Sequence, residues 1–150
     1  MMAESHEVLL QFWREQRDQA RQSENQRAAM TNIVLIVAAA AVGFVVREGI
    51  SDRANLPVTV GLMFLGLYGA LASAKYRERQ AMHLHQAKLM RRRLDASYPE
   101  LGLEADRQTA RANHRGSHRW LYRVRLYLLW TTLHLGIALT GVVLTVLIAI

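Results

Sequence analysis

Three long apolar runs divide the chain into alternating apolar and charged segments. The runs cover residues 30–46, 56–74 and 126–150, and none contains Asp, Glu, Lys or Arg. As a helix, about 20 such residues cross the ~30 Å hydrocarbon core of a bilayer. A helix that is apolar all round can also lie in the core of a soluble protein. To bury three such helices, a soluble protein would need more surrounding amphipathic segments than this chain contains. The pattern therefore predicts three transmembrane helices.

The charged segments carry a different, helical pattern. The first, residues 1–29, continues without a breaker into the first run, which predicts one helix over about residues 5–46. The second apolar run likewise continues into a heptad-like segment that ends at Tyr98-Pro99, because proline disfavours helix at the preceding residue. We expect these two extensions to pair as an antiparallel coil. A last helix is expected to begin near Leu103 and to enter the third run through a kink at Gly116.

The distribution of basic residues predicts how the chain lies in the membrane. Residues 47–55 form a short polar turn with two arginines, whereas residues 1–29 hold four basic residues and residues 75–125 hold 13 of the 19. Because cytoplasmic segments are enriched in Lys and Arg, both larger segments are expected in the cytoplasm and the turn and Ile150 outside. The predicted fold is therefore an all-α integral membrane protein with three transmembrane helices and cytoplasmic helical extensions that form an antiparallel coil.

Composition narrows the possible chemistry. The chain is 51% hydrophobic, has a formal net charge of +7 and contains no cysteine, which excludes disulfides and thiolate metal sites. No nucleotide-binding glycine loop, Gly-x-Ser-x-Gly or His-Glu-x-x-His motif is present, so we expect no enzyme, cofactor or metal site. The positive charge flanks the apolar runs, which favours anionic lipid headgroups as partners and argues against nucleic acid.

An arginine series is the most unusual charged feature. Its members stand four residues apart, so on a helix they would stay broadly on one side: Arg107, Arg111, Arg115, Arg119 and Arg123. No acidic residue follows Asp106. One interpretation is an anchor to anionic lipid headgroups, which the nearby aromatic residues favour. The other is a pocket for a soluble anion such as a nucleotide phosphate.

The third apolar run carries a polar face. Its members share one side of a helix: His134, Ala138, Gly141 and Thr145. A polar residue at this depth faces other helices or water, so the face is either a packing surface or the wall of a pore. Small residues in the other two runs indicate close helix packing: Ala39, Gly43, Gly66, Gly69, Ala70 and Ser73. Three short spans bury little surface, so a homo-oligomer is expected.

The layout resembles a known family. A helix enters a two-span hairpin through ARQSENQRAAMTN, and the second span leaves through GALASAKYRER into a basic helix. Over residues 8–95 this is similar to the SLATT-type small transmembrane effectors of bacterial antiphage and conflict systems. The resemblance implies a bacterial inner-membrane, homo-oligomeric effector that a nucleotide signal or a cytoplasmic protein activates and that permeabilises the membrane. The third span is additional to the two spans of that family.

Three functions follow as hypotheses. The first is an oligomeric inner-membrane effector or ion channel, with a cytoplasmic coil that senses a signal and a path lined by the His134 face. The second is a non-catalytic membrane scaffold or regulatory subunit that recruits a cytoplasmic partner. A small-solute transporter is the third and least favoured, because the spans lack charged residues and are few.

Overall fold

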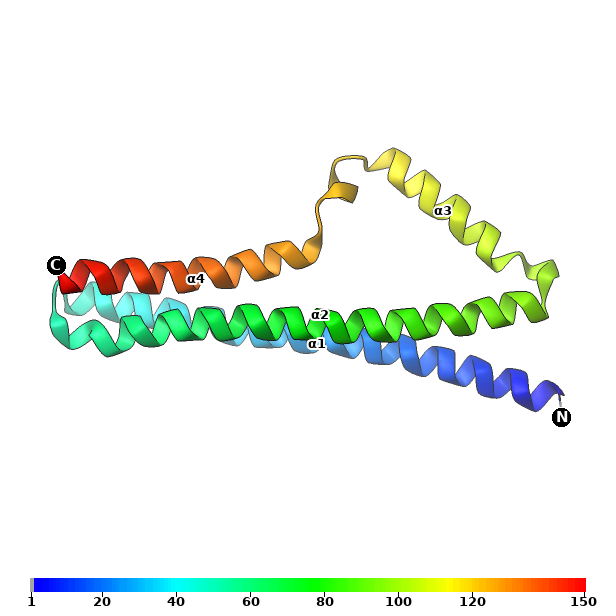
Figure 1. Ribbon diagram of the computed structural model, residues 1–150, viewed down its shortest axis with the longest axis horizontal. Helices are drawn as coiled ribbons and strands as arrows, with labels where there is room; N and C mark the ends of the chain where they lie inside the picture. Colours follow the sequence, from blue (N-terminus) through cyan, green and yellow to red (C-terminus); the bar gives the residue numbers. More distant parts are fainter. Residues whose placement is uncertain (1) are drawn as a thin grey trace. The chain divides into compact units, whose positions relative to one another are not determined.

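The computed structural model describes the backbone of residues 2–150 and the side chains of residues 6–150. All secondary-structure elements assigned in this part of the chain are helices (Figure 1). The long helices are α1 (Met2–Glu48), α2 (Leu56–Ser97), α3 (Leu103–Ser117) and α4 (Leu126–Ala149). Short 3-10 turns connect them: η1 (Arg53–Asn55), η2 (Pro99–Leu101) and η3 (Leu121–Arg123). The all-helical prediction is confirmed.

Three of the described helices, α1, α2 and α4, are long and apolar enough to cross a membrane. They contain the three apolar runs of the sequence, and α1 and α2 continue well beyond those runs into charged segments. The chain divides into two compact units, each built from parts of both α1 and α2. Unit 1 comprises residues 1–24 and 78–125, and unit 2 comprises residues 25–77 and 126–150.

Unit 2 is a three-helix bundle with a small apolar core. Ala38, Leu62 and Leu144, one from each helix, are its buried centre. Most large apolar side chains of these helices point outward instead, as shown by the exposed fractions of Ile36 (69%) and Leu71 (72%). The interior combines a few apolar side chains with small and polar ones, whereas most large apolar side chains lie on the outside, unlike those of a water-soluble bundle.

Glycines bring α4 into contact with α2 in this bundle. A Cβ added to Gly66 would overlap the backbone of α4, with the Cα of Ala138 only 2.7 Å away. Conversely, a Cβ on Gly141 would lie 2.9 Å from the carbonyl oxygen of Thr59. Both distances are shorter than side-chain contacts allow, so the two backbones touch only because these positions lack side chains.

Polar side chains close the turn between α1 and α2. The Asp52 carboxylate accepts a 2.9 Å hydrogen bond from the Ala54 N–H, which begins η1. The amide of the buried Asn55 donates to the Gly49 carbonyl at 2.9 Å. Gly49 has φ +107°, a backbone conformation that side chains disfavour. The sequence predicted a tight polar turn here, and these bonds explain how its backbone groups are satisfied.

In unit 1, α1 and α2 are antiparallel. Gln16 is hydrogen-bonded to His83 at 2.7 Å, and the earlier His6 is bonded to Tyr98 at 2.8 Å. Partners therefore move backward along α2 as they move forward along α1. The antiparallel coil of the two extensions stays a prediction.

The predicted end of α2 is confirmed and the predicted continuation of the last helix is wrong. α2 ends at Ser97, and Tyr98 leaves the α region before Pro99. The sequence predicted one kinked helix from Leu103 into the third apolar run. Instead α3 ends at Ser117, and a turn with η3 separates it from α4. Glycine has a low helix propensity, and packing does not offset it at Gly116. No atom of a neighbouring segment lies within 4 Å of a Cβ built at this position.

A substitution at Gly66 tests the close contact between α2 and α4. We expect Gly66→Val to lower the free energy of unfolding by roughly 1–3 kcal/mol, because the new side chain overlaps the α4 backbone. Gly61→Ala, on the same helix with open space around its Cβ, is the matched control and should be neutral or slightly stabilising. Unfolding of the detergent-purified protein measures both, and equal effects of the two substitutions would contradict the packing described.

Candidate functional site

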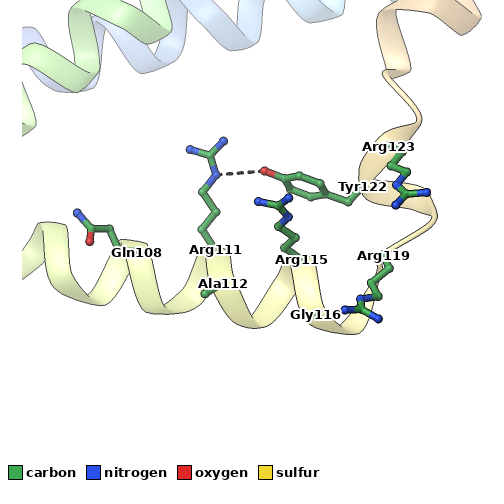
Figure 2. Close-up of a pocket in the computed structure, with 8 residues that line it drawn as sticks. All are labelled: Gln108, Arg111, Ala112, Arg115, Gly116, Arg119, Tyr122 and Arg123. Atoms are coloured by element: carbon green, nitrogen blue, oxygen red, sulfur yellow. Dashed lines mark hydrogen bonds between the residues drawn. The ribbon is translucent and has the colours of Figure 1, made fainter.

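Four of the five arginines in the series line one cavity of about 870 Å³ in unit 1. Figure 2 shows the residues around it: Gln108, Arg111, Ala112, Arg115, Gly116, Arg119, Tyr122 and Arg123. Sequence spacing predicted that the series shares one side of a helix. That prediction holds for Arg111 and Arg115 on α3 but is wrong for Arg119 and Arg123, which follow the end of α3. The reversal of the chain after Ser117, and not helical periodicity, brings these two residues to the cavity.

Tyr122 connects the two sides of this arginine cavity. Its ring points back toward α3 from η3 (Figure 2), and its hydroxyl accepts a 3.3 Å hydrogen bond from Arg111 Nε. The guanidinium carbon of Arg115 lies 5.6 Å from the ring centroid, within cation–π range. The hydrogen bond from Arg111, together with its charge, lowers the pKa of Tyr122 below the usual 10.0. The aromatic side chain therefore holds two arginines at the wall of the cavity.

The arginine cavity has no acidic side chain on its wall. Among the described residues, no carboxylate lies within ion-pair distance of Arg111, Arg115, Arg119 or Arg123. Guanidinium groups bind phosphate and carboxylate oxygens in bidentate geometry. The arrangement can therefore hold an anion, from either a lipid headgroup or a soluble molecule, and the choice between these two interpretations stays open.

Arg107, the first member of the series, lies elsewhere. It is paired with Glu104 at 3.3 Å, and Glu104 also accepts a 2.8 Å bond from Arg91 of α2. Partial burial raises the pKa of Glu104, but the charges of the two arginines outweigh it and the net shift is below the usual 4.5. The backbone N–H of Glu104 also donates to Asp95 at 3.3 Å. These contacts fasten the first turn of α3 to α2.

The polar face of α4 lies inside unit 2. His134 is fully buried, and its Nε2 is hydrogen-bonded to the hydroxyl of Thr31 on α1 at 3.1 Å. Its other ring nitrogen packs against Gly69 of α2. Further along α4, Thr145 donates to the hydroxyl of Thr59 at 2.9 Å. In this structure the four predicted residues of the face contact α1 or α2 or are buried beside them, and lining of a pore stays a prediction.

A buried arginine beside this face was missed from the sequence. Arg27 is only 4% exposed and its guanidinium lies 5.7 Å from the Trp130 ring centroid. It stands one helical turn before Thr31, as Trp130 stands one turn before His134. Arg27 lies just outside the first apolar run and was counted only among the basic residues of residues 1–29. Its spacing from Thr31 could have placed it on the inner face.

The small residues fall into two groups. Gly66, Gly69, Ala70 and Ser73 on α2 are buried or lie against α4. By contrast, Ala39 and Gly43 on α1 are exposed, and nothing lies within 4 Å of a Cβ added to Gly43. The first group lets α2 pack closely inside the bundle. The second group forms an exposed strip of small residues on the outer side of α1.

Within the side chains the structure describes, no group of three or more His, Asp or Glu could hold a metal ion. The rings of His114 and His118 lie with their centroids 5.0 Å apart. Among the described residues, no carboxylate is hydrogen-bonded to either ring.

Removing the buried hydrogen bond between α1 and α4 should destabilise the bundle. We expect Thr31→Val to lower the free energy of unfolding by about 0.5–1.5 kcal/mol, a typical value for interhelical bonds in membrane proteins. In a His134→Ala background the same substitution should cost markedly less, because the partner is already lost. A double-mutant cycle on the purified protein measures the difference, and strictly additive losses would mean that the two side chains do not interact.

The ion pairs of Glu104 predict a pH dependence for α3. Because the folded-state pKa of Glu104 is lowered, its stabilising effect is complete above about pH 4.5 and is lost as the pH falls further, through the folded-state pKa. Hydrogen exchange in α3, corrected for its intrinsic pH dependence, should therefore show protection that decreases below this point. Glu104→Gln should have weaker protection at neutral pH and little of this decrease. An unchanged acid profile in the variant would contradict the assignment.

Comparison of the chain with protein-family models, with curated proteins and with solved structures finds no match.

Proposed function

We propose that this protein is an oligomeric inner-membrane effector that alters membrane integrity when its cytoplasmic unit receives an anionic signal. The observation that carries the proposal is the combination of two features in one chain. Unit 2 contains three helices of membrane length with a polar interior. Unit 1 contains a cavity lined by four arginines and, among described residues, no paired carboxylate.

The surface of unit 2 supports insertion into lipid. Large apolar side chains cover its outside, whereas hydroxyl, amide and imidazole groups lie inside: Thr31, Thr59, Ser73, Asn55 and His134. Lipid cannot satisfy polar groups, so a membrane bundle keeps them between its helices. This distribution would be unfavourable in water and is expected in a bilayer.

The basic residues support a cytoplasmic unit 1. Unit 1 holds 11 of the 13 basic residues of residues 75–125, all but Lys75 and Arg77, together with Arg14, Arg17 and Arg21. The positive-inside rule then places the turn at residues 49–55 and the end of α4 outside. In this orientation the arginine cavity is accessible to cytoplasmic molecules.

An oligomer is needed for any aqueous path. The helices of one bundle pack closely, with α2 and α4 in backbone contact at Gly66 and Gly141, so we expect an aqueous path to form between copies. The exposed strip of Ala39 and Gly43 on α1, with Asn32 on the same side, would let the α1 helices of two copies approach closely. Activation would then rearrange the bundle and turn the His134 face toward a shared path.

The resemblance to small transmembrane effectors of antiphage systems agrees with this function. In that setting, loss of membrane integrity would halt an infected cell. The proposal itself rests on the helices and the cavity, and antiphage defence is its biological interpretation.

Permeability measurements with arginine variants test the proposal. Bacterial cells that express the protein should lose membrane potential and admit an impermeant dye when the protein is activated. Arg111→Gln, Arg115→Gln and Arg119→Gln together should abolish this response while the protein still fractionates with membranes. A matched triple variant at the exposed Arg14, Arg79 and Arg93, which line neither this cavity nor the one described below, should retain it.

The alternative function is a membrane scaffold or regulatory subunit that recruits a cytoplasmic protein. The exposed basic surface of unit 1 favours this alternative, because a charged helical surface can bind a protein as well as a small anion. Crosslinking in intact membranes distinguishes the two functions. Ladders of the chain with itself support the effector, whereas one unlike protein in stoichiometric amount, without a permeability change, would replace the effector with the scaffold.

A further inference from the structure

A second cavity in unit 1 lies between three helices. It has a volume of about 520 Å³ and is lined by Trp13 and Arg17 of α1, by His85, Lys88 and Arg91 of α2, and by Arg107 of α3. Small-molecule sites in proteins have volumes of roughly 300–1,000 Å³. The cavity shares no lining residue with the arginine cavity of Figure 2.

The second cavity is cationic, and part of its charge is held in place. Arg91 and Arg107 both bind Glu104, at 2.8 and 3.3 Å, so one carboxylate orients two guanidinium groups from different helices. The Nε of Arg91 is buried and has no hydrogen-bond partner. Arg17 and Lys88 have no carboxylate within ion-pair distance among the described residues. Two of the four cations on this wall therefore pair with one carboxylate and the other two pair with none, which leaves an excess of positive charge.

Trp13 gives the cavity a second kind of contact. Its indole is partly exposed on the wall that also carries the cations. Indole faces stack with flat aromatic rings, and cations beside them bind phosphate oxygens. A simple inorganic anion would use the cations and leave the indole without a role.

We propose that this cavity binds a small soluble molecule that carries both phosphate groups and an aromatic ring, of which a nucleoside polyphosphate is the simplest example. Arg17, Lys88 and Arg107 would bind the phosphates, and Trp13 would stack on the ring. Such a ligand touches α1, α2 and α3 at once, so its binding would stabilise the association of the three helices. This site goes beyond the anionic signal proposed for the arginine cavity and does not depend on it.

A lipid headgroup is a less suitable source of the phosphate. Arg17 precedes the first apolar run, which begins at Met30, by more than ten residues, and Lys88 follows the second run, which ends at Ala74, by more than ten. These positions lie on helical segments rich in charged residues, which favours a ligand that reaches the cavity from water.

Titration calorimetry with the full chain in detergent tests the site, with ATP, inorganic triphosphate and adenosine as probes. ATP should bind saturably and more tightly than either of the other two. Arg17→Gln with Lys88→Gln should weaken ATP binding about tenfold or more, since charge-assisted bonds to phosphate are lost. Trp13→Leu should weaken ATP binding several-fold to about tenfold through lost stacking and leave triphosphate binding unchanged. The helical circular dichroism of each variant should match that of the parent protein.

Control variants make the outcome decisive. Arg14→Gln with Arg93→Gln, at exposed positions that line neither cavity, should leave ATP binding unchanged. The proposal is overturned if ATP does not bind saturably, if Arg17→Gln with Lys88→Gln has no effect, or if vesicles of anionic phospholipid displace ATP from the site. Since calorimetry does not measure permeability, failure here leaves the effector proposal standing, and failure of the permeability test leaves this site standing.

Discussion

The contact between the backbones of α2 and α4 is the constraint on which unit 2 depends. Gly66 and Gly141 allow the helices to touch, and Gly69 makes room for the imidazole of His134. That imidazole then reaches Thr31 on α1, so one side chain joins all three helices. Larger residues at these glycines would separate α4 from α2 and leave the buried polar groups without partners, which costs free energy because buried polar groups need hydrogen bonds.

In unit 1 electrostatic contacts replace this close packing. Glu104 fastens α3 to α2 through Arg91, and Tyr122 holds η3 against α3 through Arg111. Because acidic residues are absent after Asp106, the remaining arginines have no carboxylate nearby in sequence. The unit is thereby fixed at two points and left cationic around its two cavities. We regard this excess of positive charge as the feature most relevant to ligand binding.

The sequence predicted the features that depend on local patterns. Apolar runs predicted the three membrane-length helices, and Tyr98-Pro99 predicted the end of α2. It did not predict contacts between distant segments, such as the burial of Arg27 against Trp130, because periodicity identifies a helical face but not what covers it. The grouping of Arg119 and Arg123 with Arg111 required a chain reversal at residues 118–120, where no strong turn motif stands. The second cavity is formed by residues of three helices, and no pattern within one helix predicts it.

The continuity of the helices has a mechanical consequence. α1 and α2 pass from one unit to the other without a break, whereas α3 and α4 are separated by a turn and an extended residue at Val124. Under the proposed function, a rotation or axial shift of α1 or α2 would pass along the same helix from unit 1 to unit 2, whereas the turn after α3 interrupts the helical path to α4. Ligand occupancy in unit 1 would then act on the bundle through α1 and α2, the two helices that both units share.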